Sequence, residues 1–328
     1  MSKTKAHRRS INRPSKFIEK HWNLVKRCLL GLPSFDKLRE RRPYKKDNVV
    51  YLLDDKDHTA WIWQGRIGRC KTYRVPSSVE VDGTHYTVTS IEISAFKTPK
   101  TLHHLIIPDT IEYVDGDVFS FIPNLRSVHI GKGVRALSNW HFRCCPKLRV
   151  IDLSKENPHL KIEDGLVLSA DGKELWRSLF RRKELRIPEG VECVKDVACW
   201  YDDKLESITF PSSLRTIGDN SFTGLPKLKK VVLPEGLEDL VVQCFMDCKN
   251  LEYVDLPSTL HRIGWKTFVD CMSLKTLIVR SFIELDSRFE DPECYPFETC
   301  RLYVPQELVE TYRKNSWWGL FKHILPIQ

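Results

Sequence analysis

Two stretches of the chain, LESITFPSSLRTIGDNSF at residues 205–222 and LEYVDLPSTLHRIGWKTF at residues 251–268, share one pattern of apolar residues. Each begins with Leu, alternates polar and apolar residues up to a Pro, and continues through two spaced apolar residues to a Phe. The pattern recurs with a period of 23 residues, and its leading residues are Leu102, Leu125 and Leu148, then Leu205, Leu228, Leu251 and Leu274. A fixed period of this length indicates a repeat protein.

The pattern within one unit predicts a coil of chain that contains a short β-strand. Strict alternation of polar and apolar residues is typical of a strand with one buried face. The Pro that follows has no N–H to donate to a sheet, so it ends the strand. One coil cannot bury its own apolar edges, and successive coils must therefore stack. The sequence predicts a repeat solenoid of about eight 23-residue units with a parallel sheet, and little regular helix outside residues 15–32.

One unit is longer than the others. The interval from Leu148 to Arg182, which begins the next unit, is 34 residues. The eleven extra residues lie around Glu163–Leu175, where the sequence EDGLVLSADGKEL contains two Asp-Gly pairs. Asp-Gly favours the tight turns of β-hairpins because both residues tolerate a positive φ. We therefore predict a hairpin insertion in this unit.

Several further motifs occur in a fixed order. Three units end in Phe-x-x-Cys, at Phe142–Cys145, Phe245–Cys248 and Phe268–Cys271. The remaining motifs are the segments Val75–Phe96, Asp164–Pro188 and Arg301–Tyr312. Together they resemble the BspA-like, or Treponema pallidum-type, leucine-rich repeat family over roughly residues 49–328. The resemblance implies a right-handed coil with a curved parallel sheet, and members of the family are commonly secreted or displayed on the cell surface.

The resemblance and the repeat divide the chain into four parts. Residues 1–48 form a basic arm, residues 49–101 an N-terminal hairpin and first repeat, residues 102–300 the leucine-rich repeats, and residues 301–328 a C-terminal capping segment. We expect residues 49–328 to fold without the arm. The chain shows no signal peptide and no apolar run long enough to cross a membrane, so a cytoplasmic location is the default expectation, in contrast to the exported members of the family.

The arm carries the excess charge of the protein. Residues 1–48 hold 15 Lys or Arg and four acidic residues, a net charge of +11, whereas the remaining residues have a net charge of −2. Apolar residues recur at helical spacing over residues 15–32, which predicts an amphipathic helix between Ser15 and Pro33. This helix could cap the amino-terminal edge of the solenoid, lie on an anionic membrane, or bind nucleic acid; the arm could equally be a tail.

The sequence contains none of the common catalytic or cofactor-binding motifs, so we predict a protein that is not an enzyme and that needs no cofactor. Cys244, Cys248 and Cys271 are close enough in sequence to suggest a metal site. However, each occupies a position that recurs from unit to unit, and buried structural cysteines explain the spacing better. No metal site is predicted.

We expect the function to be recognition of a macromolecule, with a protein as partner. In a leucine-rich repeat the strand residues between the buried positions project from the concave face, and these are the candidate binding residues: His104, His129, Glu184, Arg186, Lys230, Tyr253 and Asp255. A plain solvated sheet face is the simplest alternative. A glycan-binding or glycan-processing surface protein is another, with Trp61, Trp63, Trp140, Trp176 and Trp200 as sugar platforms. A membrane-associated scaffold held by the basic arm is a third.

Overall fold

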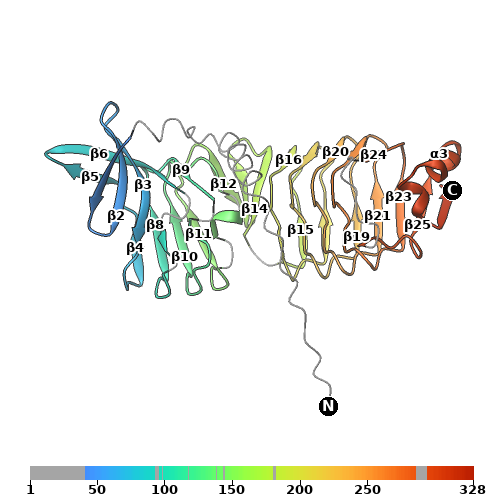
Figure 1. Cartoon of the computed structure of the whole chain (residues 1–328), viewed down its shortest axis with the longest axis horizontal. Coiled ribbons are helices and arrows are strands. Elements are labelled where there is room, and N and C mark those ends of the chain that lie inside the picture. The colour runs from blue at the N-terminus through green and yellow to red at the C-terminus, as the bar shows by residue number, and fades with distance from the viewer. Residues whose placement is uncertain are drawn as a thin grey trace, which may run out of the picture.

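The computed structural model describes residues 41–92, 96–97, 99–116, 118–137, 139–142, 145–179, 182–285 and 294–328. The amphipathic helix predicted over residues 15–32 lies outside the described residues. Within them the chain forms a solenoid whose coils follow one another from the N-terminal sheet to a short C-terminal helix (Figure 1). The predicted repeat solenoid, with little helix in its body, is confirmed.

One wall of the solenoid is built from the strands predicted in the repeat units, together with one further strand before them and two after them; all of these are here called the long strands. They pair in parallel and in register, so that Ser127 lies between His104 and Val150 in the ladder, and Tyr253 lies between Lys230 and Thr276. The long strands are β4 (Thr72–Arg74), β8 (His104–Ile107), β10 (Ser127–Ile130), β11 (Val150–Leu153), β15 (Glu184–Arg186), β17 (Ser207–Thr209), β19 (Lys230–Val232), β21 (Tyr253–Leu256), β23 (Thr276–Val279), β25 (Arg301–Val304) and β26 (His323–Pro326).

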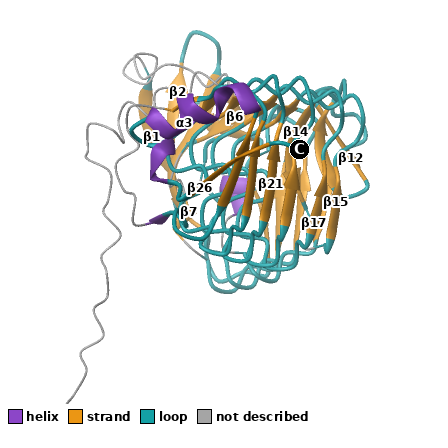
Figure 2. Ribbon diagram, turned by 90° about the vertical axis from the view of Figure 1, so that its right-hand side faces the viewer, coloured by secondary structure: helices purple, strands orange, loops and turns teal. Residues whose placement is uncertain are grey.

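A second ladder of two-residue strands forms where each coil turns back. Its strands are β9 (Tyr113–Val114), β16 (Cys193–Val194), β18 (Thr216–Ile217), β20 (Asp239–Leu240), β22 (Arg262–Ile263) and β24 (Glu284–Leu285). From β16 to β24 these strands pair in parallel, one coil to the next. Figure 2, viewed from the C-terminal end, shows the strands of successive coils ranged behind one another.

The N-terminal sheet comprises β1 (Arg42–Lys46), β2 (Val49–Asp54), β3 (Thr59–Arg66), β5 (Ser78–Val81), β6 (Thr84–Ile91) and β7 (Phe96–Lys97). β9 also pairs with β6 in parallel, and this pairing joins the sheet to the coil that follows. The first repeat predicted within residues 49–101 is therefore continuous with this sheet.

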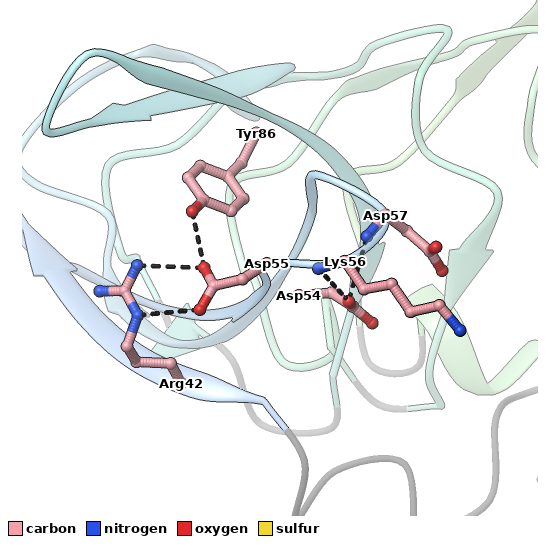
Figure 3. A network of polar contacts seen from close by, with 6 residues as sticks. All are labelled: Arg42, Asp54, Asp55, Lys56, Asp57 and Tyr86. Atoms are coloured by element: carbon pink, nitrogen blue, oxygen red, sulfur yellow. Dashed lines mark hydrogen bonds and ion pairs between the residues drawn. The ribbon is translucent and has the colours of Figure 1, made fainter.

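Strand β1 lies on the arm side of the predicted boundary at residue 48. It pairs antiparallel with β2, and the Arg42 guanidinium donates to both carboxylate oxygens of Asp55 at 3.3 and 3.1 Å. The hydroxyl of Tyr86, on β6, donates to the same carboxylate at 2.6 Å (Figure 3). Two backbone N–H groups of the β2–β3 turn bond the neighbouring Asp54 carboxylate. Residues 42–46 therefore belong to the N-terminal sheet, because their backbone pairs with β2 and the Arg42 side chain bonds Asp55.

The predicted hairpin insertion is present. β12 (Leu160–Glu163), β13 (Leu166–Ser169) and β14 (Glu174–Ser178) form an antiparallel meander. The turn between β12 and β13 consists of Asp164 and Gly165, both with positive φ, at 45° and 69°. β14 then pairs in parallel with β16, so the insertion becomes the start of the short-strand ladder of the second half.

The insertion also interrupts the wall of long strands. β11 pairs with β10, and β15 pairs with β17, but no pairing joins β11 to β15 within the described residues. The core divides at the same place. One cluster of buried side chains extends from Val49 to Trp176 and the other from Leu166 to Ile324. The solenoid is thus two stacks of coils joined by the hairpin meander.

Stacked phenylalanines fill the centre of each stack. The rings of Phe222, Phe245 and Phe268 lie nearly parallel, with centroids 5.5 and 5.9 Å apart, and Phe96, Phe119 and Phe142 repeat this arrangement at 5.9 and 6.2 Å. Cys199 occupies the equivalent place in the unit after the insertion. The column of the first stack is closed at Phe142 by Arg177, whose guanidinium carbon lies 5.7 Å from the centroid of the Phe142 ring.

The C-terminal segment closes the other end of the solenoid. Strands β25 and β26 extend the long-strand ladder, and helix α3 (Val309–Lys314) lies between them in the chain. Tyr312 of α3 is fully buried, and its hydroxyl donates to the carbonyl of Ser281 at 2.7 Å. The indole N–H of Trp318 donates to the carbonyl of Ile283 at 3.2 Å. These contacts cover the last apolar coil, as a cap must.

Candidate recognition surface

All seven predicted binding residues lie on long strands, at positions that alternate with buried ones. On β21, for example, Val254 and Leu256 are buried while Tyr253 and Asp255 are only partly so. Glu184, Arg186 and Lys230 are exposed, and the buried Leu185 and Val231 are their neighbours. We call the outward side of the long strands the long-strand face. Whether a partner binds there stays a prediction.

Four charged or aromatic side chains converge on β19, β21 and the end of β23. The ammonium nitrogen of Lys230 lies 4.8 Å from the centroid of the Tyr253 ring. The hydroxyl of Tyr253 donates to Asp255 at 3.4 Å. Asp255 also receives a bidentate pair of hydrogen bonds from Arg280, at 3.0 and 2.9 Å. We call Lys230, Tyr253, Asp255 and Arg280 the tyrosine cluster.

The surroundings of Arg280 and Tyr253 favour the protonated form of each. The hydrogen bond from Arg280 to Asp255, together with the charge of that carboxylate, raises the pKa of the guanidinium. Partial burial and then the negative charge of Asp255 raise the pKa of the Tyr253 phenol above its ordinary value. A bidentate Arg–carboxylate pair is geometrically specific, so the cluster presents an ordered polar surface with one aromatic ring.

The other predicted residues lie apart from the tyrosine cluster. Nδ1 of His104 lies 2.7 Å from the Ser127 hydroxyl, and Nδ1 of His129 lies 2.7 Å from Oδ2 of Asp152, both in the sheet of the first half. Glu184 and Arg186 are 3.8 Å apart on β15, in the two-stranded sheet between. The seven residues therefore form three separate groups along one face.

Arg280 is not among the binding residues predicted from the sequence. It occupies the position after the strand, where most units have the Pro that ends the strand and two others have Gly131 and Ser154, so the absence of Pro does not by itself mark this residue. Val232, which lies opposite Asp255 in the ladder, is 46% exposed beside the tyrosine cluster. Its alternation with the buried Val231 places it on the outward side, as the strand pattern predicts.

The thiols of the Phe-x-x-Cys motifs have a structural role. The thiol of Cys145 donates to the carbonyl of Phe119 at 3.3 Å, that of Cys248 to Phe222 at 3.3 Å, and that of Cys271 to Phe245 at 3.1 Å. In each case the carbonyl belongs to the Phe of the preceding coil. Over the described residues, no three His, Cys, Asp or Glu side chains come together in a way that could hold a metal ion.

The tryptophans proposed as sugar platforms differ in exposure where their side chains are described. Trp61 and Trp176 are buried, and the Arg41 guanidinium covers Trp61 at 3.7 Å from its ring. Trp63 is 40% exposed, and Trp200 stacks edge-on against Tyr201. The side chain of Trp140 lies outside the described residues.

None of the helices in the described part of the chain is long and apolar enough to cross a membrane.

Comparison with known families gives a match over most of the repeats. The family described as "BspA type Leucine rich repeat region" matches six copies within residues 78–165 and 173–292. No curated protein matches the chain.

Two solved structures with TM-scores of at least 0.50 share the fold. A leucine-rich repeat protein from Bacteroides ovatus is 21% identical, with a TM-score of 0.53 over 86% of this chain and 67% of that one. A leucine-rich repeat protein from Eubacterium ventriosum is 15% identical, with a TM-score of 0.50 over 79% of this chain and 82% of that one. A T. pallidum leucine-rich repeat protein is 18% identical, with a TM-score of 0.37 over 71% of this chain and 91% of that one.

Proposed function

Since the chain belongs to the BspA-type leucine-rich repeat family, we propose that it is a non-enzymatic binding protein that presents its long-strand face to a protein partner. Repeats of this family are generally non-catalytic. The fold itself supports the proposal, because stacked coils give an extended surface whose outward residues have no role in packing. The position of the site on this face is our inference from exposure and chemistry.

The observation that carries the proposal is the tyrosine cluster. Protein interfaces are enriched in Tyr and Arg, and these residues often contribute most of the binding energy. Here a Tyr ring, an ordered Asp–Arg pair and a Lys lie together beside the exposed Val232. The buried residues of the same strands pack in the core and stabilise the coil. The outward side chains are therefore not required for folding.

The test combines partner capture with a stability measurement on the full chain. Tyr253→Ala together with Arg186→Ala should leave the melting temperature nearly unchanged, because both side chains lie outside the core. Quantitative capture of bound proteins should fall for this variant. Lys173→Ala, on the hairpin meander, is the matched surface control and should bind as the unmodified chain does. Capture that is insensitive to Tyr253 and Arg186 but falls with Lys173→Ala would place the site on the meander.

The basic arm supports a second, separate proposal. With a net charge of +11 over residues 1–48, it is suited to an anionic membrane surface or to nucleic acid. Binding of the full chain to vesicles containing anionic lipid should weaken steeply as salt is raised, because screening and counterion release act on each contact. Binding that is insensitive to salt would argue against a role for the arm's charge.

A further inference from the structure

A row of residues stands immediately before the long strands, one residue per coil. In the first half of the solenoid its members are Lys71, His103, Arg126 and Arg149, which precede β4, β8, β10 and β11. The backbone joins them directly. The N–H of His103 donates to the carbonyl of Lys71 at 2.8 Å, that of Arg126 to His103 at 2.7 Å, and that of Arg149 to Arg126 at 3.0 Å. The four side chains therefore leave adjacent coils at the same edge of the face.

Every residue of the row in the first half is Lys, Arg or His, whereas basic and acidic residues alternate along the row in the second half. In the second half the same position is occupied by Lys183, Glu206, Lys229, Glu252 and Lys275. There the ammonium of Lys275 lies 2.9 Å from Glu252, and that of Lys183 lies 3.7 Å from Glu206. The fold accepts either sign at this position, so the like charges of the first half are not a requirement of the coil.

The basic side chains have no acidic partner in the described part of the chain. The guanidinium of Arg149 donates to the backbone carbonyls of Pro146 and Leu148, and Lys147 beside it donates to Asn124. Partial burial, followed by the positive charges of Arg126, Lys71, His104 and Lys147, lowers the pKa of His103. The lowered pKa leaves His103 mostly neutral at pH 7, so the like charges that meet on adjacent coils are those of Arg126 and Arg149, and their repulsion costs the free protein some stability.

We propose that Lys71, His103, Arg126, Lys147 and Arg149, here called the basic row, bind an acidic segment of a protein partner. The proposal rests on the proposed function, since it names the chemistry that such a partner must present. Neighbouring coils are about 4.8 Å apart. Carboxylates on one face of a helix recur about every 5.4 Å, one per turn, whereas those on one face of an extended chain recur about every 6.6 Å. The spacing favours an acidic helix.

Two other occupants fit less well. The chain's own arm has a net charge of +11 and would be repelled by the row. Single-stranded nucleic acid is bound through aromatic side chains on which bases stack. The long strands of the first half carry one aromatic residue other than histidine among their described residues, Tyr73, and it faces inward against Phe96.

The experiment uses the full chain and a synthetic helical peptide with Glu at every turn. Carbodiimide joins carboxylates to nearby lysine amines, and mass spectrometry locates the joined lysines. We expect the peptide to be joined to Lys71 and Lys147. The double variant Arg126→Gln with Arg149→Gln should reduce joining at Lys71 and Lys147 roughly tenfold. Each exposed ion pair contributes little, so the loss of two pairs weakens peptide binding by about one power of ten. Joining at lysines of the arm should be unchanged, which separates the two basic regions. Lys229→Gln, at the equivalent position of the second half, is the matched control and should have no effect on Lys71 or Lys147.

Two results would overturn the proposal. One is joining that is as frequent at Lys229 and Lys275 as at Lys71 and Lys147. The other is protection of Lys71 and Lys147 by a sulfated glycan or an oligonucleotide but not by the Glu peptide, which would assign the row to a different class of partner. Neither result bears on the tyrosine cluster, because the peptide probe does not depend on the partner captured through Tyr253.

Discussion

At the scale of single residues, the Phe-x-x-Cys motif acts as one unit that spans two coils. The Phe ring stacks on the Phe rings of its neighbours, and the Cys thiol bonds the carbonyl of the Phe one coil earlier. The sequence pattern predicts the buried column. It does not predict the thiol–carbonyl bond, because spacing alone does not indicate where a side-chain donor points. The thiol gives this carbonyl a hydrogen-bond donor, which an apolar residue at the same position, such as Leu225, does not supply.

Phe245→Ala should lower the free energy of unfolding by about 3–5 kcal/mol, because it removes a fully buried ring that stacks on both neighbours. Chemical denaturation monitored by circular dichroism measures this change. Met272→Ala is the control, since that side chain is 53% exposed, and it should shift the curve little. A small effect of Phe245→Ala would mean that the stack is loosely packed.

The buried thiols predict a loss of stability in alkaline solution. Burial raises the pKa of Cys199 and Cys244, and that of Cys300 to about 12. Unfolded thiols ionise near pH ~8.5. Below that pH the thiols are protonated in both states, and their contribution to the free energy of unfolding is fully present. Above it the unfolded chain loses protons that the folded chain retains, and stability falls by up to about 1.4 kcal/mol per pH unit for each such thiol. Denaturation midpoints from pH 7 to pH 10 measure the slope, and Cys244→Ala should reduce it. A slope that Cys244→Ala leaves unchanged would contradict this account.

At the scale of elements, the hairpin meander decides how the two stacks of coils meet. The Asp-Gly pairs predict the turns, and the structure confirms the antiparallel strands. The sequence does not predict that β14 continues into the short-strand ladder or that the long-strand wall is interrupted between β11 and β15. Pairing across the insertion depends on which edge the meander covers, and no local pattern encodes that choice.

Gly165→Val should destabilise the meander by about 1–2 kcal/mol. Gly165 has a φ of 69° in the two-residue turn, where a β-branched side chain is strained. Gly68→Ala is the control, because an added Cβ at that position meets no atom within 4 Å. Thermal unfolding of the two variants compares them. Equal melting temperatures would show that the turn adopts another conformation.

The candidate surface was predictable only in part, and for a physical reason. Alternation along a strand identifies which residues point outward, as for Tyr253 and Asp255. It does not identify which outward residues meet, since that depends on the register between coils and on side-chain reach. Arg280 reaches Asp255 from beyond the end of its strand, and the basic row emerges only when the coils are placed side by side.

At the scale of the whole molecule, charge and structure divide the chain at different places. The charge boundary at residue 48 falls inside the β1–β2 hairpin, because β1 is rich in basic residues yet is paired. Arg41 stacks on Trp61 and also forms an ion pair with Asp54 at 3.2 Å. The folded body therefore includes the last basic residues of the arm, which contact acidic and aromatic side chains of β2 and β3.

Two truncations of the full chain test this division. Deleting residues 1–40 retains Arg41 and β1, and the melting temperature should stay close to that of the full chain. Deleting residues 1–48 removes β1, the Arg42–Asp55 pair and the cover over Trp61, and it leaves the edge of β2 unpaired. An unpaired strand edge is prone to association, so this second protein should melt at a lower temperature and aggregate on concentration. Light scattering and thermal unfolding distinguish the two. If both truncations melt as the full chain does, β1 adds nothing to the fold and the body begins at β2. If both melt at a lower temperature, residues before Arg41 also support the fold.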